Sequence, residues 1–421
     1  MERYSFLKNA ATLISGNVWA QLISLLSYFV LTRIFTPEDF GLYNIFFSYI
    51  EILIILSTCK FELSIVVAKT DRQAAVLARL ALRLNAIVSA VILTAIIFIH
   101  YVFHRIPLSV GLLIPPMVFF CGTTRVYTFI FNRYSQFKQI AISEVATSTT
   151  GFLAKLALAF SSLLHFIGLP LGTVLGKAAG NINYLLRLRK LPQYQQAKSE
   201  SVTNSEMRQA ALSSKNFPLY VMPKDFLNSF SNNLPFIWLA LYFDDALVGI
   251  FSLALTFTFR PVNILNNAFE KLLYVRTSER VKSRLPIGAD IRKFILILNA
   301  IAFPIAVIGF FFAEPIFTLC FGAKWAGIGY YVRCLLPWVY IMLTSTSLMF
   351  ISNVFSTQRT EFFFCVAQFI LRAASVLVGI LTGNFQLSIL LFALSGALTA
   401  ITLLIWYLSQ VRRYDNSLSV N

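Results

Sequence analysis

Long apolar segments recur along the whole chain and are separated by short polar ones. Each apolar segment has about 20 residues or more, which is enough to cross the hydrocarbon core of a membrane as an α-helix. The longest interruption, residues 187–216, is polar, basic and rich in Gln and Ser. The pattern predicts six spans within residues 1–186, a linker loop at 187–216 and six more spans within 217–421. The twelve predicted spans are 11–34, 41–66, 82–103, 108–131, 140–163, 167–186, 217–242, 247–269, 293–313, 331–354, 361–382 and 385–410.

The two halves share a motif at the turn between their first and second spans. A shift of 208 residues (243 minus 35) lays Phe35–Tyr43 over Phe243–Phe251, and Gly41 or Gly249 opens the second span of each half. An even number of spans gives both halves the same orientation in the membrane. We therefore expect two six-helix bundles related by a pseudo-twofold axis along the membrane normal, with a binding site between them.

Composition and charge agree with an all-α polytopic membrane protein. The chain is 57% hydrophobic and 13% charged, whereas soluble domains have about 25% charged residues. With the N-terminus in the cytoplasm, 24 of the 35 Lys and Arg residues lie in cytoplasmic segments, four lie on the opposite side and seven lie at helix depth. This bias predicts that both termini are cytoplasmic, and it explains the net charge of +17 without nucleic acid. The basic cytoplasmic loop 271–293 also has the charge to attract anionic membrane lipids.

The cations at helix depth are the first candidates for function. An ionised side chain at the membrane centre costs about 2.5–3.5 kcal/mol, so it usually faces a bundle interior or a wet cavity. Acids are fewer there, mainly Glu51, Glu62 and Asp225. The excess of cations over acids predicts a cationic cavity that binds an anion. For each cation taken singly, an ion pair or a contact with the backbone is the alternative to a place in that cavity. The seven are Lys60, Arg125, Lys155, Lys177, Lys224, Arg260 and Arg372.

Two of the acids have different expected roles. Glu62 lies two residues from Lys60 and is the candidate partner in an ion pair. Glu51 has no cation among its sequence neighbours, so it is the candidate for a coupling acid.

The hairpin Lys215–Glu270 combines most of these signals. Lys224 and Asp225 lie about two turns inside its first helix, and Arg260 lies deep in the second. Helices interrupted by proline are tolerated in membranes where neighbours or water satisfy the backbone. We predict that this hairpin forms one wall of a polar cavity and that three prolines let its helices bend, namely Pro223, Pro235 and Pro261.

The sequence lacks the patterns of catalytic and cofactor sites. It has no metal-ligand spacing, no phosphate-binding loop and no nucleophile motif, so we expect no enzyme activity and no cofactor, with ion or proton coupling left open. None of the five cysteines forms a C-x-x-C pair, and a disulfide between Cys320 and Cys334 is left open.

Several motifs carry a family resemblance. The segments LTR at 31–33, PEDFG at 37–41 and FELSI at 61–65 resemble the opening of O-antigen (Wzx-type) polysaccharide flippases, with Phe61 where the family usually has Tyr. Later segments, such as FGAKWAGIGYYVRCLLPW at 321–338, are similar to the same family. These flippases belong to the multidrug/oligosaccharidyl-lipid/polysaccharide (MOP) exporter superfamily, and the resemblance extends over nearly the whole chain.

The resemblance implies a V of two six-helix bundles, similar to multidrug and toxin extrusion (MATE) transporters, in a bacterial cytoplasmic (inner) membrane. It also implies that helices 1, 2, 7 and 8 line the central cavity. On this chain those helices carry Asn17, Glu51, Lys60, Glu62, Lys224, Asp225 and Arg260.

The implied function is movement of undecaprenyl-diphosphate-linked oligosaccharides from the cytoplasmic to the periplasmic leaflet, by alternating access. Arg260 and Lys224 are the expected diphosphate-binding cations, with Arg372, Lys155 and Lys177 as secondary ones. A polysaccharide polymerase and a chain-length regulator are the expected protein partners. The alternatives are a cation- or proton-coupled drug exporter of the same superfamily and, disfavoured by short outer loops, a membrane-embedded glycan polymerase or acyltransferase.

Overall fold

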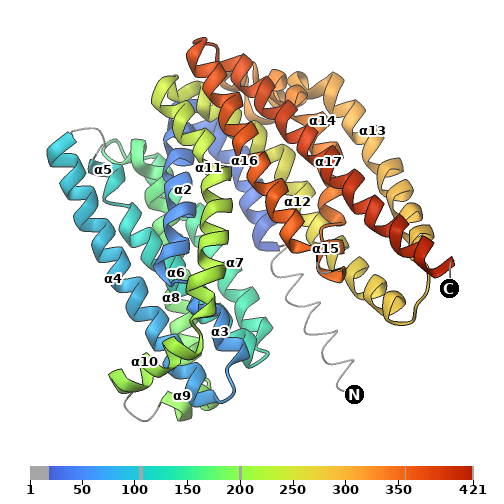
Figure 1. Cartoon of the computed structure of the whole chain (residues 1–421). Helices are drawn as coiled ribbons and strands as arrows, with labels where there is room; N and C mark the ends of the chain where they lie inside the picture. The colour runs from blue at the N-terminus through green and yellow to red at the C-terminus, as the bar shows by residue number, and fades with distance from the viewer. Residues whose placement is uncertain (1–18, 104–107, 199–201, 356, 420–421) are drawn as a thin grey trace. The chain divides into compact units, whose positions relative to one another are not determined.

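The computed structural model describes residues 19–103, 108–198, 202–355 and 357–419 (Figure 1). These residues form helices joined by short turns, with no strand among them, so the all-α prediction is confirmed. Packing contacts divide the chain into two compact units, Met1–Asn233 (unit 1) and Leu234–Asn421 (unit 2). Asn17, a predicted cavity residue, lies outside the described residues.

Unit 1 contains the helices of the first half and most of the polar segment that follows. Its first described helix is Trp19–Ile34. The others before the polar segment are α2 (Pro37–Ser57), α3 (Phe61–Val67), α4 (Asp71–Phe103), α5 (Leu108–Gly111), α6 (Ile114–Arg133), α7 (Phe137–Ala159), η1 (His165–Ile167) and α8 (Gly168–Leu188).

The polar segment 187–216, expected to be a loop, contains two short helices, α9 (Pro192–Lys198) and α10 (Asn204–Ser213). A capping box begins α10: the hydroxyl of Thr203 accepts from the backbone N–H of Glu206, and the Glu206 carboxylate accepts from that of Thr203. The hydrogen bond from the Thr203 N–H lowers the pKa of Glu206 below its ordinary value. The hydrogen bond from the guanidinium of Arg72 on α4 makes the second-largest contribution. These bonds explain why a polar sequence is helical here, and they attach α10 to α4.

A five-residue π-helical segment, η2 (Phe217–Val221), leads into α11 (Met222–Tyr242). The division between the units falls inside α11, two residues before Pro235. Residues 222–233 of this helix therefore belong to unit 1.

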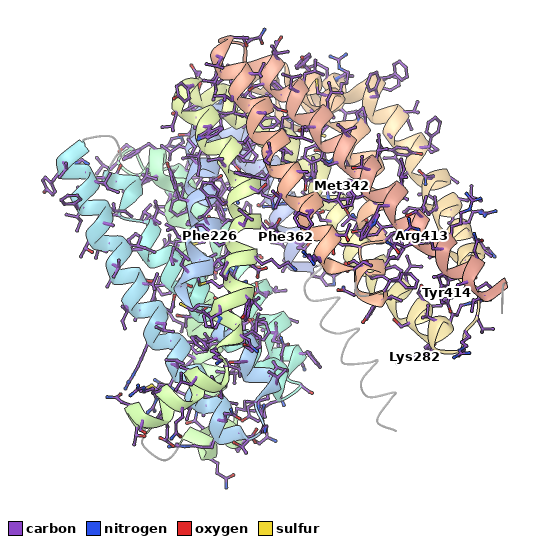
Figure 2. The ribbon with its side chains drawn as sticks, in the orientation of Figure 1. Phe226, Lys282, Met342, Phe362, Arg413 and Tyr414 are labelled. Atoms are coloured by element: carbon purple, nitrogen blue, oxygen red, sulfur yellow. The ribbon has the colours of Figure 1, made fainter. Side chains whose placement is uncertain are left out.

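Unit 2 begins in α11 and continues with long helices. Near the end of α17, the hydroxyl of Tyr414 lies 3.4 Å from the carbonyl oxygens of Val281 and Leu285, beside the turn that follows Lys282 (Figure 2). The elements after α11 are α12 (Asp245–Lys282), α13 (Gly288–Phe321), η3 (Ala323–Trp325), α14 (Ile328–Ser347), α15 (Ile351–Val354), α16 (Gln358–Leu381) and α17 (Phe385–Ser419).

The helices pack in the same order within each unit. In unit 1, α6 packs against α2, α4 and α8, and α8 packs against α7. In unit 2, α14 packs against α12, α13 and α17, and α17 packs against α16. In each half of the chain, a tyrosine of the sixth span also donates to a glutamate of the fifth, Tyr184 to Glu144 at 3.4 Å and Tyr407 to Glu361 at 3.2 Å. Two copies of one ancestral bundle would produce this shared arrangement.

The described helices correspond to the predicted spans. Eight segments are long and apolar enough to cross a membrane, and Trp19–Ile34 is a shorter apolar helix. Three further helices, α7, α8 and α11, have span-like lengths of 23, 21 and 21 residues but carry more polar and small residues. Together these twelve segments bear out the twelve-helix architecture.

Three predicted spans are interrupted, and another predicted loop is mostly helical. The span 108–131 breaks between Gly111 and Ile114. The span 41–66 breaks after Ser57, where Cys59 and Lys60 have left-handed φ angles of 49° and 62°. The span 331–354 breaks between Ser347 and Ile351. The expected loop 271–293 is largely the end of α12 and the start of α13, because charged side chains at the water interface do not prevent a helix from continuing.

Glycines let α7 and α8 approach closely. A Cβ built on Gly176 of α8 would lie 2.6 Å from the Cα of Gly151 on α7 and 2.8 Å from the carbonyl oxygen of Thr147. A Cβ on Gly151 would not be crowded, because its nearest atom would lie 3.6 Å away. Small residues at such contacts are typical of membrane helices, where close packing replaces the hydrophobic effect as the source of association.

Candidate functional site

A cluster of charged side chains in unit 1 joins the α2–α3 turn to α11. The left-handed turn before α3 holds Lys60, whose ammonium lies 2.7 Å from a carboxylate oxygen of Asp225. The Lys60 side chain is 12% exposed and that of Asp225 is 36% exposed. Lys224 is exposed and forms no ion pair with another described residue. The three side chains therefore carry one net positive charge.

This geometry corrects two expectations. Lys60 lies in a turn rather than inside a continuous helix, and its ion-pair partner is Asp225 instead of Glu62. Glu62 is buried, and its carboxylate accepts a hydrogen bond from the hydroxyl of Thr58. The pairing with Asp225 joins residues 165 positions apart (225 minus 60), so sequence proximity gives no sign of it.

Glu51 has partners on α11 that sequence reasoning missed. The amide nitrogen of Asn233 donates to the Glu51 carboxylate at 3.0 Å, and the hydroxyl of Ser229 donates to the Glu51 backbone carbonyl at 2.7 Å. The Glu51 side chain is otherwise exposed. An exposed carboxylate held by a neutral amide is able to take up a proton or a cation, and its coupling role remains a proposal.

Lys155 of α7 faces the interior of unit 1. Its ammonium donates to the hydroxyl of Tyr43 at 2.9 Å and lies 4.8 Å from the centre of the same ring. The Tyr43 hydroxyl also lies 3.1 Å from that of Thr173 on α8. These contacts hold the cation between α2, α7 and α8 and give Lys155 a packing role inside the bundle.

A second interior group of unit 1 lies between α6, α7 and α8. The ammonium of Lys177 is 3.9 Å from the carboxylate of Glu144, to which Tyr184 also donates. The amide of Asn181 donates to the hydroxyl of Thr124 at 3.0 Å. On α6, one buried guanidinium nitrogen of Arg125 has no hydrogen-bond partner among the described residues. Lys177 is thus partly neutralised within the bundle.

In unit 2, Arg372 of α16 is buried, with only 7% of its surface exposed. Its guanidinium lies 5.0 Å from the ring of Trp338 on α14 and 5.6 Å from that of Phe392 on α17. Aromatic faces attract a cation through the ring quadrupole, and more strongly where water is excluded. The contacts connect three helices of unit 2.

Arg260 differs from Arg372 because its side chain is exposed on α12, immediately before Pro261. Pro235 and Pro261 lie inside α11 and α12, and Pro223 lies in the first turn of α11. A proline inside a helix removes one backbone hydrogen bond and favours a bend. The hinge roles of these prolines remain proposals.

The seven cations therefore fall into separate groups. Lys60, Lys155, Lys177 and Arg372 contact acidic or aromatic groups of their own unit. Arg125 is largely enclosed. Lys224 in unit 1 and Arg260 in unit 2 have exposed side chains, which makes them the cations most accessible to a ligand.

The Lys60–Asp225 pair permits a test of its structural role. Replacing Asp225 with Asn leaves the mostly buried Lys60 without its counter-ion, and we expect a loss of about 1–3 kcal/mol, between the values for exposed and for fully buried pairs. Removing both charges, with Lys60→Met and Asp225→Asn, is expected to recover part of that loss. Thermal unfolding of the two single variants and the double variant measures the coupling. Strictly additive losses would mean that the pair contributes nothing.

Comparisons with known proteins identify the fold. A MATE-family multidrug resistance transporter of the MOP superfamily, in an inward-facing conformation, matches with a TM-score of 0.67 and 12% sequence identity, over 94% of this chain and 96% of that one. An outward-facing MATE structure matches with a TM-score of 0.63, 12% identity and coverage of 97% and 96%. A MOP-superfamily transporter from Pyrococcus furiosus, described as having a binding pocket of reverse polarity, matches with a TM-score of 0.62, 12% identity and coverage of 97% and 95%.

The chain is a multi-pass membrane protein with the fold of MOP-superfamily transporters. It belongs to the family of polysaccharide biosynthesis proteins, whose family model matches residues 30–329. A comparison with curated protein sequences finds no match. Membership of this family agrees with the flippase resemblance given by the sequence motifs.

Proposed function

We propose that this protein is a flippase that moves undecaprenyl-diphosphate-linked oligosaccharides from the cytoplasmic to the periplasmic leaflet of a bacterial inner membrane. One observation carries the proposal: in a polysaccharide-biosynthesis chain with a transporter fold, consecutive helices α11 and α12 each expose a cation, Lys224 and Arg260. A drug exporter for organic cations needs the opposite charge. The product of this activity serves O-antigen or another surface polysaccharide.

The chemistry follows from the charge of the substrate. A diphosphate is too polar to enter hydrocarbon, and the attraction of a cation for it grows as the local dielectric constant falls. Lys224 and Arg260 bind the diphosphate, and the polyprenyl tail stays in lipid while the sugars cross a wet cavity. Three other cations have contacts with aromatic or acidic side chains inside their own bundle, namely Arg372, Lys155 and Lys177. They stabilise the packing of the bundles and add positive charge to them.

Coupling to an ion or proton is assigned to Glu51. Its carboxylate accepts from Asn233 on α11, the same helix that carries Lys224. Protonation removes the charge that the Asn233 amide contacts and so weakens the link between α2 and α11. Binding of a proton or an ion to Glu51 would therefore allow α11 to move relative to α2.

Gene deletion and complementation test the function. Deletion in the host is expected to abolish the surface glycan and to leave completed lipid-linked units facing the cytoplasm, and the wild-type gene restores export. Persistence of the surface glycan together with a change in drug sensitivity would favour the exporter. A new covalent product from the purified protein and a lipid-linked substrate would identify an enzyme.

A further inference from the structure

A cavity of about 330 Å³ lies in unit 1 where α6 ends, α7 begins and α8 ends. It is separate from the charged cluster on α11 and from the interior group around Lys177. The positions of Arg133, Lys138, Arg187 and Lys190 in segments predicted to be cytoplasmic put this end of the unit on the cytoplasmic side. Its lining residues are Phe131, Gln136, Gln139, Asn183, Leu186, Arg187, Lys190 and Leu191.

The polar side of the cavity is rich in hydrogen-bond donors. Arg187 donates through Nε to the Asn183 side-chain oxygen at 2.7 Å and through Nη1 to the side-chain oxygen of Gln139. Both amide oxygens accept from Arg187, and that of Asn183 also accepts from the hydroxyl of Ser143 at 3.0 Å, so the two amide nitrogens remain as donors. Lys190 adds an exposed ammonium group.

Charge makes the cavity selective for an anion. Arg187 and Lys190 form no ion pair with a described residue, and no Asp or Glu lines the cavity. The amino end of α7 also begins there, at Phe137, and no side chain caps its first amides. A helix dipole places partial positive charge at that end, so it adds to the attraction.

The other side of the cavity is apolar and adjoins the lipid-facing surface. Leu186 lines the cavity and is 53% exposed, while Ile182 and Leu185 on the same helix are also exposed. Exposed aliphatic side chains on a membrane helix contact acyl chains. A ligand that fits both sides has an anionic head and an apolar tail, and basic pockets at the cytoplasmic ends of membrane helices bind such headgroups.

We propose that this cavity binds the phosphate headgroup of an anionic membrane phospholipid, with Arg187 and Lys190 as the charged contacts. Gln139 and Asn183 hold the guanidinium in place and donate their amide hydrogens to the phosphate oxygens. The acyl chains lie along the exposed aliphatic face of α8. This site is independent of the flippase activity proposed above, because it lies outside the residues assigned to the transported substrate.

The test measures lipid binding to the purified full-length protein in detergent, with phosphatidylglycerol, phosphatidylcholine, inorganic phosphate and undecaprenyl diphosphate as separate probes. Phosphatidylglycerol is expected to bind and to raise the unfolding temperature, with little effect of phosphatidylcholine or free phosphate. Lys190→Gln is expected to weaken phosphatidylglycerol binding about fivefold, as for one cation near a membrane surface. Gln139→Glu is expected to weaken it at least as much, because the added carboxylate pairs with Arg187 and repels phosphate.

Gln139→Glu also separates binding from folding. The new ion pair keeps Arg187 in place, so this variant without lipid is expected to be as stable as the wild type. The matched control is Arg412→Gln with Arg413→Gln, which removes two exposed cations near the end of α17 in the other unit. Binding unchanged in both cavity variants, or lost equally in the control, would overturn the proposal. Equal stabilisation by inorganic phosphate would assign a free anion instead, and tighter, competing binding of undecaprenyl diphosphate would assign a polyprenyl lipid.

Discussion

Replacing both Lys224 and Arg260 with glutamine is expected to lower glycan export at least about tenfold, with normal amounts of protein in the membrane. Hydrogen bonds to charged groups contribute about 1.5–3 kcal/mol each, and loss of either contact to the diphosphate affects binding directly. Both side chains are exposed. We therefore expect little change in folding, in contrast to what replacement of the buried Arg372 would do.

The measurement is the rate of surface-glycan appearance in a deletion strain that carries each variant, beside the amount of lipid-linked unit left on the cytoplasmic side. Arg413→Gln is the control, because it removes an exposed cation near the end of α17, where the neighbouring Tyr414 meets the carboxyl end of α12 at Val281, 21 residues beyond Arg260 (281 minus 260) (Figure 2). Each single variant should fall between the wild type and the double variant. Export at the wild-type rate in the double variant would remove both residues from the substrate site without contradicting a flippase function.

Gly176→Ala is expected to destabilise the protein by about 1–3 kcal/mol, the usual cost of overpacking. The new methyl group would lie 2.6 Å from the Cα of Gly151 and 2.8 Å from the Thr147 carbonyl oxygen, so α7 and α8 must separate. Alanine alone would favour the helix by about 1 kcal/mol over glycine. Steric crowding against backbone atoms exceeds that gain, because the backbone cannot rotate away as a side chain does.

Gly151→Ala provides the matched control at the same contact. Its methyl group would lie 3.6 Å from the nearest atom, which is an ordinary van der Waals distance. This variant is expected to be as stable as the wild type or slightly more stable. Thermal unfolding in detergent and the yield of monodisperse protein compare the two. Equal stability of the two variants would show that helix packing at this point is looser than the structure indicates.

Hydropathy along the sequence is sufficient for most of the architecture. A membrane span must satisfy its own backbone hydrogen bonds, so a long apolar segment has almost no choice but to form a helix. This physical constraint explains why a predicted span such as 385–410 lies within one helix, α17. Polar spans were recognised as well, because α7 and α8 remain rich in apolar and small residues between their charges.

The details of the charged groups depend on tertiary contacts and were predicted less well. Sequence proximity favours Glu62 as the partner of Lys60, but the turn at Cys59 and Lys60 directs the ammonium to Asp225 on a distant helix. The contact between Glu51 and Asn233 likewise joins residues 182 positions apart. Such pairs form only when two helices pack, and a single sequence carries no periodic signal for them. The contacts of Arg372 with aromatic rings on two other helices have the same explanation.

Each unit is formed by one continuous stretch of sequence, with the division at residues 233 and 234. The order of synthesis therefore matters, because domains generally fold as units and the amino-terminal part emerges first. The close contact between α7 and α8 uses only residues that have entered the membrane before α12 is translated. Assembly of the first bundle can thus begin during translation. Its intramembrane charges then spend less time in lipid without the residues that they contact in the folded unit. Lys60 and Glu51 are exceptions in this sequence of events, because their contacts with Asp225 and Asn233 form only after α4 to α8 have been inserted and α11 arrives.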